Sequence, residues 1–160
     1  MNERVGLGFD VHRLEEGRPC ILGGVTIDHP TGPAGHSDGD AVLHAIIDAL
    51  TGAAGLDDVG TMFPDTDETW KGADSARLLE AVVERVGDAG FQIGNVDVVI
   101  ATEGPRIAPM RASMRERIGA LLRVDAGAIN VKGKTLEGLG ALAEGLGGAV
   151  QAICLLRESG

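Results

Sequence analysis

The sequence predicts an α/β (α+β) domain with a small mixed β-sheet and helices packed on one face of that sheet. Three observations support this fold class. Short apolar runs typical of strands are interspersed with segments whose apolar residues recur every three or four positions, as in helices. The expected order of elements is β-β-α-α-β-α-β-β. The chain of 160 residues contains no internal repeat or linker, so we treat residues 1–160 as a single domain.

The N-terminal part is expected to form strands. Residues 4–9 make the first strand. Residues 19–22 and 25–27 make two short strands joined at Gly23-Gly24, a pair that favours a hairpin or a bulge. Residues 28–34 contain two prolines and are expected to be a loop.

The stretch GHSDGDAVLHAIIDAL, residues 35–50, predicts a polar turn followed by a helix. Ser37 and Asp40 have the S-x-x-[DE] spacing of a capping box, which places the helix start near Ser37. Residues 56–75 are rich in Asp, Gly, Pro and Thr and show no periodicity. A segment this long without regular structure is often functional, so we expect a mobile loop that orders over a ligand; a plain surface excursion is the alternative.

The C-terminal half is expected to alternate helices with strands. Helices are predicted over residues 76–86 and about 109–123, where apolar side chains fall on one face. Strands are predicted over residues 96–101, 128–131 and 149–156. The last strand is almost continuously apolar, so we expect it to be buried on both faces. A turn and a polar loop connect these elements at residues 102–106 and 132–140.

The composition excludes several classes of partner. A net charge of −10 is unsuited to a phosphate backbone, and three Phe, one Trp and no Tyr offer no platform for stacking single-stranded bases. No apolar run approaches about 18 residues and no signal peptide opens the chain, so we expect no membrane contact and a cytoplasmic location of the bacterial type; a plastid form with its transit peptide removed is the alternative. Cys20 and Cys154 match no metal or redox spacing and are expected to be buried free thiols.

Asp10, His12 and His44 form a candidate metal-ligand set. Residues i and i+2 of an extended segment point to the same side, so Asp10 and His12 can converge on one atom. One oxygen and two nitrogen ligands with a fourth position open are typical of a catalytic zinc site. Unrelated polar residues at the ends of elements are the alternative. Asp40 and Asp48 share a helix face with His44, and either can orient its imidazole or be a solvated surface residue.

His36 and Ser37 precede the predicted helix, where backbone N–H groups and the helix dipole favour an anion such as phosphate. Alternatively, Ser37 is only a cap and His36 only a loop residue. His29 has no carboxylate or histidine at helical or strand spacing, and we assign it no role.

The tripeptide GKT at residues 133–135 is not part of a P-loop. That motif requires glycine at position 128, where this chain has Ala128, and Gly138 and Gly140 follow too soon for a helix. The segment still offers the hydroxyl of Thr135 as a donor and the carboxylate of Glu137 as an oxygen ligand for a hard cation.

Several motifs together resemble one enzyme family. They are similar to the 2-C-methyl-D-erythritol 2,4-cyclodiphosphate synthase family of the non-mevalonate isoprenoid pathway, and the similarity runs from about Val5 to Leu156. The most specific parts are HSDGD followed by a helical histidine, and FPDTD. The full set of motifs is GFDVH, AGHSDGDAVLHAIIDAL, DDVGTMFPDTD, WKGADS, GNVDVVI and TLEGLG.

The resemblance implies a cyclising, metal-dependent phosphorus–oxygen lyase. Its substrate would be 4-diphosphocytidyl-2-C-methyl-D-erythritol 2-phosphate. An oxygen of the 2-phosphate attacks the β-phosphorus, CMP leaves, and the 2,4-cyclodiphosphate forms. Because the nucleophile is already an anion, no strong general base is required. The protein has to bend a flexible polyanion into line and stabilise the developing charge.

The resemblance also implies the assembly and the metal ligands. The family forms homotrimers with three active sites, each between adjacent subunits. Asp10, His12 and His44 would hold a divalent ion, usually zinc. Glu137 would ligate a second ion, magnesium or manganese, at the substrate diphosphate.

The implied substrate contacts come from four segments. His36 and Thr135 would stabilise the transition state by hydrogen bonds. Residues 58–60 and 63–67 would hold the erythritol part, and residues 102–108 of a neighbouring subunit would cradle the cytosine. The complete set of implied substrate-binding residues is Asp10, His12, His36, Ser37, Asp58, Gly60, Phe63, Asp65, Asp67, Thr102, Pro105, Arg106, Ile107, Ala108, Lys134, Thr135 and Glu137.

Two departures from the family pattern concern charge. Where members commonly read G-F-T-G-R-G-E-G, this chain has Ala141 and Glu144 in place of Phe and Arg. These positions help to form a central trimer cavity that can hold an isoprenoid diphosphate, so we expect that Glu144 prevents such binding. Lys134 stands where the family more often has a small hydroxyl residue, and it either adds a charge near the diphosphate or extends into solvent.

Two other functions would use similar residues. A metal-dependent phosphohydrolase would have the same ligands with water as the nucleophile, and it would release free phosphate instead of cyclic diphosphate and CMP. A non-catalytic, zinc-stabilised trimer would bind cytidine nucleotides without turnover. Product analysis distinguishes these functions.

Overall fold

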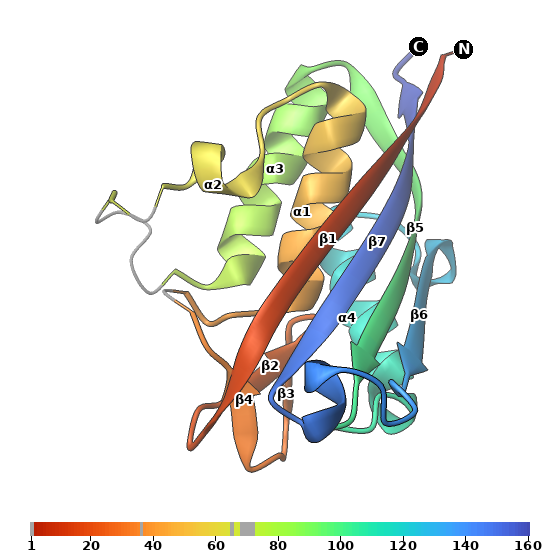
Figure 1. The fold of residues 1–160 in the computed structure, drawn as a ribbon. Helices are drawn as coiled ribbons and strands as arrows, with labels where there is room; N and C mark the ends of the chain where they lie inside the picture. The colour runs from red at the N-terminus through yellow and green to blue at the C-terminus, as the bar shows by residue number, and fades with distance from the viewer. Residues whose placement is uncertain (1, 36, 65, 68–72) are drawn as a thin grey trace.

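A twisted mixed β-sheet covered by helices on one face dominates the structure, as predicted (Figure 1). The computed structural model describes residues 2–35, 37–64, 66–67 and 73–160. Its strands are β1 (Glu3–Glu16), β2 (Cys20–Leu22), β3 (Val25–Ile27), β4 (Thr31–Pro33), β5 (Phe91–Thr102), β6 (Ile129–Lys134) and β7 (Gly147–Glu158). Its α-helices are α1 (Ala41–Ala54), α2 (Val59–Met62), α3 (Ser75–Asp88) and α4 (Arg111–Leu122). Short 3₁₀ helices cover Ala108–Met110, Ala126–Ala128 and Ala141–Glu144.

The main sheet has the strand order β4-β1-β7-β5-β6. β7 lies between β1 and β5 and is antiparallel to both, whereas β5 and β6 are parallel. β2 and β3 form the predicted separate hairpin around Gly23-Gly24. In Figure 1, α1, α3 and α4 lie on the same side of the sheet, so the helices of the predicted layer indeed share one face.

Several strands are longer than the sequence predicts. β1 continues to Glu16 and pairs with β4, which lies in the predicted loop 28–34. The sequence pattern does not predict this edge pairing, because charged residues end β1 and a proline ends β4. Proline is tolerated at the edge of a sheet. β6 extends to Lys134, so residues 132–134 belong to a strand instead of the predicted polar loop 132–140.

The prediction that the last strand is buried on both faces is wrong for the single chain. Val150, Ala152 and Cys154 of β7 are buried on the side of the helices, whereas the side chain of Ile153 is 50% exposed on the other side. The outward residues of β7 are partly apolar, namely Ala149, Ile153 and Leu155, but no helix among the described residues covers that part of the sheet (Figure 1).

Helix α1 begins at Ala41, four residues later than the capping-box pattern predicts. Asp40 is its N-cap, and the carboxylate accepts hydrogen bonds from the backbone N–H groups of the first turn. The same carboxylate accepts the N–H groups of Gly23 at 2.9 Å and Gly24 at 2.6 Å. Asp40 therefore joins the start of α1 to the β2–β3 hairpin, which explains why this charged residue is fully buried.

The other predicted helices form close to their expected bounds. α3 covers residues 75–88, and α4 is preceded by a 3₁₀ turn at residues 108–110. The buried faces of these two helices include Leu79, Val82, Met114 and Ile118, as their spacing predicts. Within the predicted irregular segment 56–75, residues 59–62 form the short helix α2.

Gly6 and Gly8 bring the backbone of β1 against the backbone of α1. A Cβ atom at Gly6 would lie 1.8 Å from the carbonyl oxygen of Ala49, and a Cβ atom at Gly8 would lie 1.8 Å from that of Ala45. No real side chain fits at that distance, so only glycine permits this contact. The contact sets the position of α1 on the sheet.

Two further expectations concern the chain as a whole. Cys20 and Cys154 are buried free thiols, as predicted. Within the described ranges, no helix combines the length and the apolar character needed to cross a membrane.

We expect the substitution Gly8→Ala to destabilise the protein by about 3 kcal/mol, because the new methyl group would force α1 away from β1. Chemical denaturation measures this loss. The matched control is Gly52→Ala on α1, where a Cβ atom meets nothing within 4 Å; it should be neutral or gain up to about 1 kcal/mol from helix propensity. Equal stability of the two variants would contradict a tight strand–helix contact.

Candidate metal centre

The contact between β1 and α1 places three metal-binding side chains together. Asp10 and His12 follow Gly8 at alternate positions of β1, so their side chains share the face that packs on α1. His44 lies in the first turn of α1, directly before Ala45, whose carbonyl oxygen contacts Gly8. The two ligands expected at the end of a strand therefore lie within β1, which runs on to Glu16.

The predicted set of Asp10, His12 and His44 converges on a small volume. The Oδ2 atom of Asp10 lies 2.9 Å from Nδ1 of His12 and 3.2 Å from Nδ1 of His44. One ligand atom from each residue lies within 4.8 Å of the others, and the side chains are 14–23% exposed. This is a half-buried oxygen–nitrogen–nitrogen group of the size that holds a divalent ion.

The Nδ1 atom of His12 gives a test of whether the group fits a cation. It is buried and has no hydrogen-bond partner among the described residues, although Oδ2 of Asp10 is only 2.9 Å away. The two atoms are close but not aligned for a hydrogen bond, so a proton between them does not account for the contact. A cation shared by both atoms would satisfy them, and we conclude that these residues fit a metal ion.

The other nitrogen of His44 faces Ser75 at the start of α3. Nε2 lies 2.9 Å from the hydroxyl oxygen of Ser75 and 3.4 Å from that of Ser37. The hydroxyl of Ser75 donates to Oδ1 of Asp38, and its backbone N–H donates to Oδ2 of Asp38 at 3.1 Å. Of the two alternatives for Asp40 and Asp48, the one in which either orients the imidazole is wrong. Asp40 caps α1, and Asp48 accepts the backbone N–H of Val59.

Asp48 connects the centre to α2. Asp48 lies one helical turn beyond His44 on α1. Its Oδ1 atom accepts the backbone N–H of Val59 at 3.0 Å. Among the predicted erythritol-binding residues, Asp58 caps α2 and Gly60 lies within it. Phe63 is buried in the core next to α2.

Other predicted site residues are exposed, lie beside His44 or are not described. Asp67 is exposed on the surface. Ser37 does not cap α1; its hydroxyl accepts the N–H of Gly39 and lies near His44. His36 and Asp65 lie outside the described residues.

The electrostatics of the centre follow from the Asp10–histidine contacts. Burial raises the pKa of Asp10, but the close contacts of its carboxylate with the imidazoles of His12 and His44 outweigh burial and lower the pKa to about 2. Burial opposes the charged form of His44, yet the adjacent carboxylate of Asp10 raises the pKa of this imidazole overall. The carboxylate is therefore ionised at neutral pH and ready to bind a cation.

A second candidate site lies at the ends of β5 and β6. It is a cavity of about 350 Å³ on the sheet edge away from β4. It brings together the predicted cytosine-binding and diphosphate-binding segments and several cations. Its lining residues are Thr102, Glu103, Pro105, Arg106, Ile107, Ala108, Arg111, Lys132, Gly133, Lys134 and Thr135.

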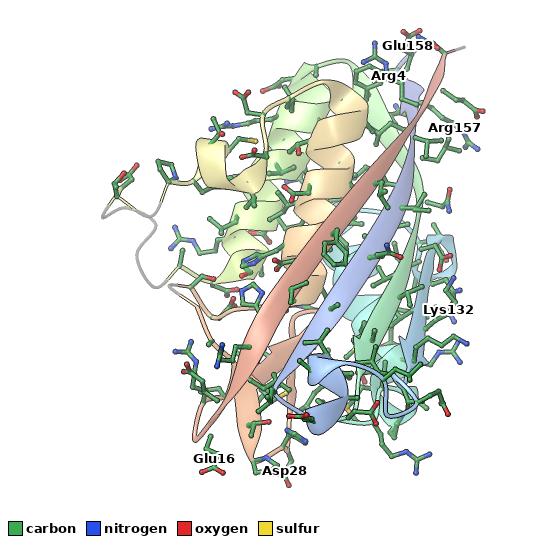
Figure 2. All side chains as sticks on the ribbon, viewed as in Figure 1. Arg4, Glu16, Asp28, Lys132, Arg157 and Glu158 are labelled. Carbon is green, nitrogen blue, oxygen red and sulfur yellow. The ribbon has the colours of Figure 1, made fainter. Side chains whose placement is uncertain are left out.

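The basic side chains of this pocket differ in whether another group of the protein already binds them. Lys132 pairs with Asp97 at 2.6 Å, and Figure 2 shows it at the β6 edge of the sheet. Arg111 donates through Nε to the carbonyl oxygen of Val131 at 2.8 Å. Arg106 and Lys134 have no ion pair within the described part of the chain, so they can bind an anion.

A hydrogen bond links the two loops that border the pocket. Glu103 accepts the backbone N–H of Leu136 at 2.6 Å, which ties the loop after β5 to the loop after β6. Thr135 donates its hydroxyl to Glu137, whose backbone has a φ of 52°, in the left-handed region. The predicted hydroxyl donor and the predicted second-ion ligand are therefore adjacent.

Three residues of these sites could not be identified from the sequence. Asp38 and Ser75 are 37 positions apart and belong to no spacing pattern, although each lies in a motif of the resemblance, HSDGD and GADS. Glu103 lies in a predicted turn, and its contact with Leu136 spans 33 positions. Only the tertiary structure brings these groups together.

The fold and the site together define an α/β protein whose Asp–His–His group has the geometry to hold a divalent ion. Comparison with known proteins identifies the family. Residues 3–157 match the YgbB family, and the chain belongs to it.

Known relatives resemble the chain over nearly its whole length. The 2-C-methyl-D-erythritol 2,4-cyclodiphosphate synthase of Laribacter hongkongensis is 54% identical over 99% of this chain and 98% of its own. A 2C-methyl-D-erythritol-2,4-cyclodiphosphate synthase solved in a CDP-bound form is 38% identical, with a TM-score of 0.90 over 96% of this chain and 100% of its own. The bifunctional IspDF of Campylobacter jejuni is 38% identical, with a TM-score of 0.94; it covers 98% of this chain, which spans 42% of that longer protein.

We expect the affinity of this centre for a divalent ion to fall as the pH decreases, because the ion must replace a proton on His44. Asp10 raises the pKa of His44, so the loss begins at a higher pH than an isolated histidine would give. Below that pKa the affinity should fall by about tenfold per pH unit for one displaced proton. Competition with a chromophoric chelator between pH 5 and 8 measures it, and a flat profile would show that binding displaces no proton.

Proposed function

We propose that this chain is a 2-C-methyl-D-erythritol 2,4-cyclodiphosphate synthase. It would convert 4-diphosphocytidyl-2-C-methyl-D-erythritol 2-phosphate to the 2,4-cyclodiphosphate and CMP, as a cyclising phosphorus–oxygen lyase of the non-mevalonate pathway. Membership of the YgbB family and 54% identity to a synthase of this name support the activity. The observation that carries the mechanism is the convergence of Asp10, His12 and His44.

Two groups of side chains would supply the metal sites. Asp10, His12 and His44 would hold zinc through Oδ2 and ring nitrogens, and Glu137, which contacts Thr135 of the pocket lining, would ligate magnesium or manganese together with the substrate diphosphate. When bound, these ions supply positive charge to the phosphoryl oxygens and stabilise the charge that develops on them. This arrangement allows a protein with a net charge of −10 to bind a polyphosphate.

The pocket at β5 and β6 would bind the nucleotide end. Its walls offer backbone groups from residues 102–108 for the cytosine, while Arg106 and Lys134 would neutralise the diphosphate. The hydroxyl of Thr135 would exchange its bond to Glu137 for one to a phosphoryl oxygen. A similar synthase structure with CDP bound supports a cytidine-diphosphate-linked substrate.

The chemistry requires positioning more than acid–base catalysis. The 2-phosphate of the substrate is the nucleophile, so the chain has to hold both ends of one flexible molecule in line. Ser37, close to His44, would contact the phosphate at the erythritol end, as His36 would. Asp58 and Gly60 would bind the hydroxyl groups of the erythritol from α2, which Asp48 holds near the centre.

We further propose a homotrimer in which each active site combines two subunits. β1 carries a row of exposed apolar side chains on the face away from α1: Val5 at 70%, Leu7 at 63%, Phe9 at 56% and Val11 at 47% exposure. Ile153 of the neighbouring β7 extends this row. An apolar surface of this kind is typical of an interface, and copies of the chain would cover it.

The two sites have different linings in one chain, although His12 of the metal centre and Thr102 of the basic pocket border the same small cavity. The metal ligands lie on β1 and α1, whereas the basic pocket lies beyond β7, at the ends of β5 and β6. The metal cluster and the lining of that pocket share no residue among those described. A neighbouring subunit would bring its pocket opposite the metal centre.

We expect His44→Ala to lose bound zinc and to reduce formation of the cyclic diphosphate by more than about 100-fold, because the ion loses one of its three protein ligands. Metal analysis and product separation by chromatography measure both effects. His29→Ala is the matched histidine control and should keep its zinc. Full turnover without zinc would contradict the metal site, and release of free phosphate by the wild type would indicate a hydrolase.

We expect Leu7→Asp to dissociate the trimer and to abolish turnover, because three carboxylates would be buried at the apolar interface. Sedimentation equilibrium measures the assembly. Ala112→Asp on the exposed side of α4 is the control and should sediment like the wild type. A wild-type protein that sediments as a monomer and still turns over substrate would contradict an active site shared between subunits.

A further inference from the structure

Ser75 and Asp38 form a hydrogen-bonded relay to His44 that the metal-ligand set does not include. We propose that Ser75, held by Asp38, is a positioning residue that keeps the His44 proton on Nε2 and leaves Nδ1 free to bind the metal ion with Asp10. This inference rests on the proposed metal centre and adds two residues to it. It also assigns a role to the start of α3.

The direction of the relay follows from the number of protons available. Ser75 has one hydroxyl proton, and an ionised carboxylate can only accept. The hydroxyl donates to Oδ1 of Asp38, so its oxygen is left to accept from the imidazole, 2.9 Å away. Nε2 of His44 therefore carries a proton that it donates to Ser75.

Backbone contacts hold the carboxylate of Asp38 in place as the acceptor of the Ser75 hydroxyl proton. Its second oxygen, Oδ2, accepts the backbone N–H of Ser75 at 3.1 Å, so the hydroxyl and the amide of one residue bind the two oxygens of one carboxylate. Oδ1 also accepts the N–H of Asp40 at 3.2 Å, at the turn before α1. Ser75 is completely buried, which strengthens these bonds and limits alternative rotamers.

The consequence appears at the opposite nitrogen of the ring. With the proton on Nε2, a neutral imidazole presents a lone pair at Nδ1, which lies 3.2 Å from Oδ2 of Asp10. Two acceptors at that distance repel each other unless a cation or a proton lies between them. The relay thus selects the tautomer in which Asp10 and His44 both offer electron pairs to the same ion.

The other polar groups near His44 are less suited to this task. The hydroxyl oxygen of Ser37 is 3.4 Å from Nε2 and already accepts the N–H of Gly39. Asp40 and Asp48 are engaged with backbone N–H groups of the hairpin and of α2. Ser75 is the nearest partner of Nε2 within the described residues.

The test compares Ser75→Ala with Ser37→Ala, a matched loss of one hydroxyl next to the same nitrogen. Zinc dissociation constants come from chelator competition, and nitrogen-15 NMR of the zinc-free proteins reports which ring nitrogen of His44 is protonated. We expect Ser75→Ala to weaken zinc binding by roughly 10- to 100-fold and to lose the Nε2–H signal that the wild type keeps. Ser37→Ala should change the dissociation constant by less than about threefold.

A conservative variant separates positioning from folding. Ser75→Thr keeps the hydroxyl and should restore zinc affinity to within a few-fold of the wild type, with the Nε2–H signal retained. Thermal unfolding of each zinc-free variant identifies any general loss of structure. Asp38→Asn should resemble Ser75→Ala in the NMR spectrum, because an amide no longer compels the hydroxyl to accept from His44.

The outcomes distinguish the relay from the proposed function. A wild-type protein that binds no zinc would overturn the metal centre itself. Wild-type zinc binding together with equal affinities of Ser75→Ala and the wild type, or an unchanged tautomer in Ser75→Ala, would overturn the relay and leave the synthase function standing. Equal weakening by Ser75→Ala and Ser37→Ala would also overturn it.

Discussion

The backbone contact between β1 and α1 is the constraint on which the site depends. Gly6 and Gly8 allow the carbonyl oxygens of Ala49 and Ala45 to approach the strand so closely that a methyl group would not fit. The ligands of the candidate centre come immediately after this contact on the strand and immediately before Ala45 on the helix. A shift of the helix by even 1 Å would therefore separate His44 from Asp10, and coordination tolerates little of such displacement. The same two glycines thus set both the packing of the core and the geometry of the chemistry.

Around this contact the charges are arranged in two regions of opposite character. The β1–α1 region gathers Asp10, Asp38 and Asp48, whereas the β5–β6 region gathers Arg106 and Lys134. The first region attracts a cation and the second an anion, and neither alone can hold a molecule with phosphates at both ends. A substrate that carries a bound metal at one end and a nucleotide diphosphate at the other would satisfy both. This division explains how an acidic chain can bind a polyanion.

The sequence was sufficient to predict what depends on local periodicity. The alternation of Asp10 and His12, the helical position of His44, the α3 and α4 helices and the mixed sheet all follow from spacing within a few residues. The sequence was not sufficient where contacts between residues far apart in the chain determine which element forms or where it begins. β4 forms only because β1 continues far enough to pair with it, and α1 starts at Asp40 because that carboxylate also binds the hairpin. Ser75 and Asp38 meet His44 through the packing of α3 on α1, which no local pattern contains.

The alternation along β1 has a consequence for how this strand can change during evolution. Gly6, Gly8, Asp10 and His12 face the helix, while Val5, Leu7, Phe9 and Val11 face outward. Every position from 5 to 12 is thus assigned to the helix contact, the candidate centre or the apolar surface. Inserting or deleting one residue would exchange the two faces and lose all three properties at once. We therefore expect this strand to accept substitutions more readily than a change in length.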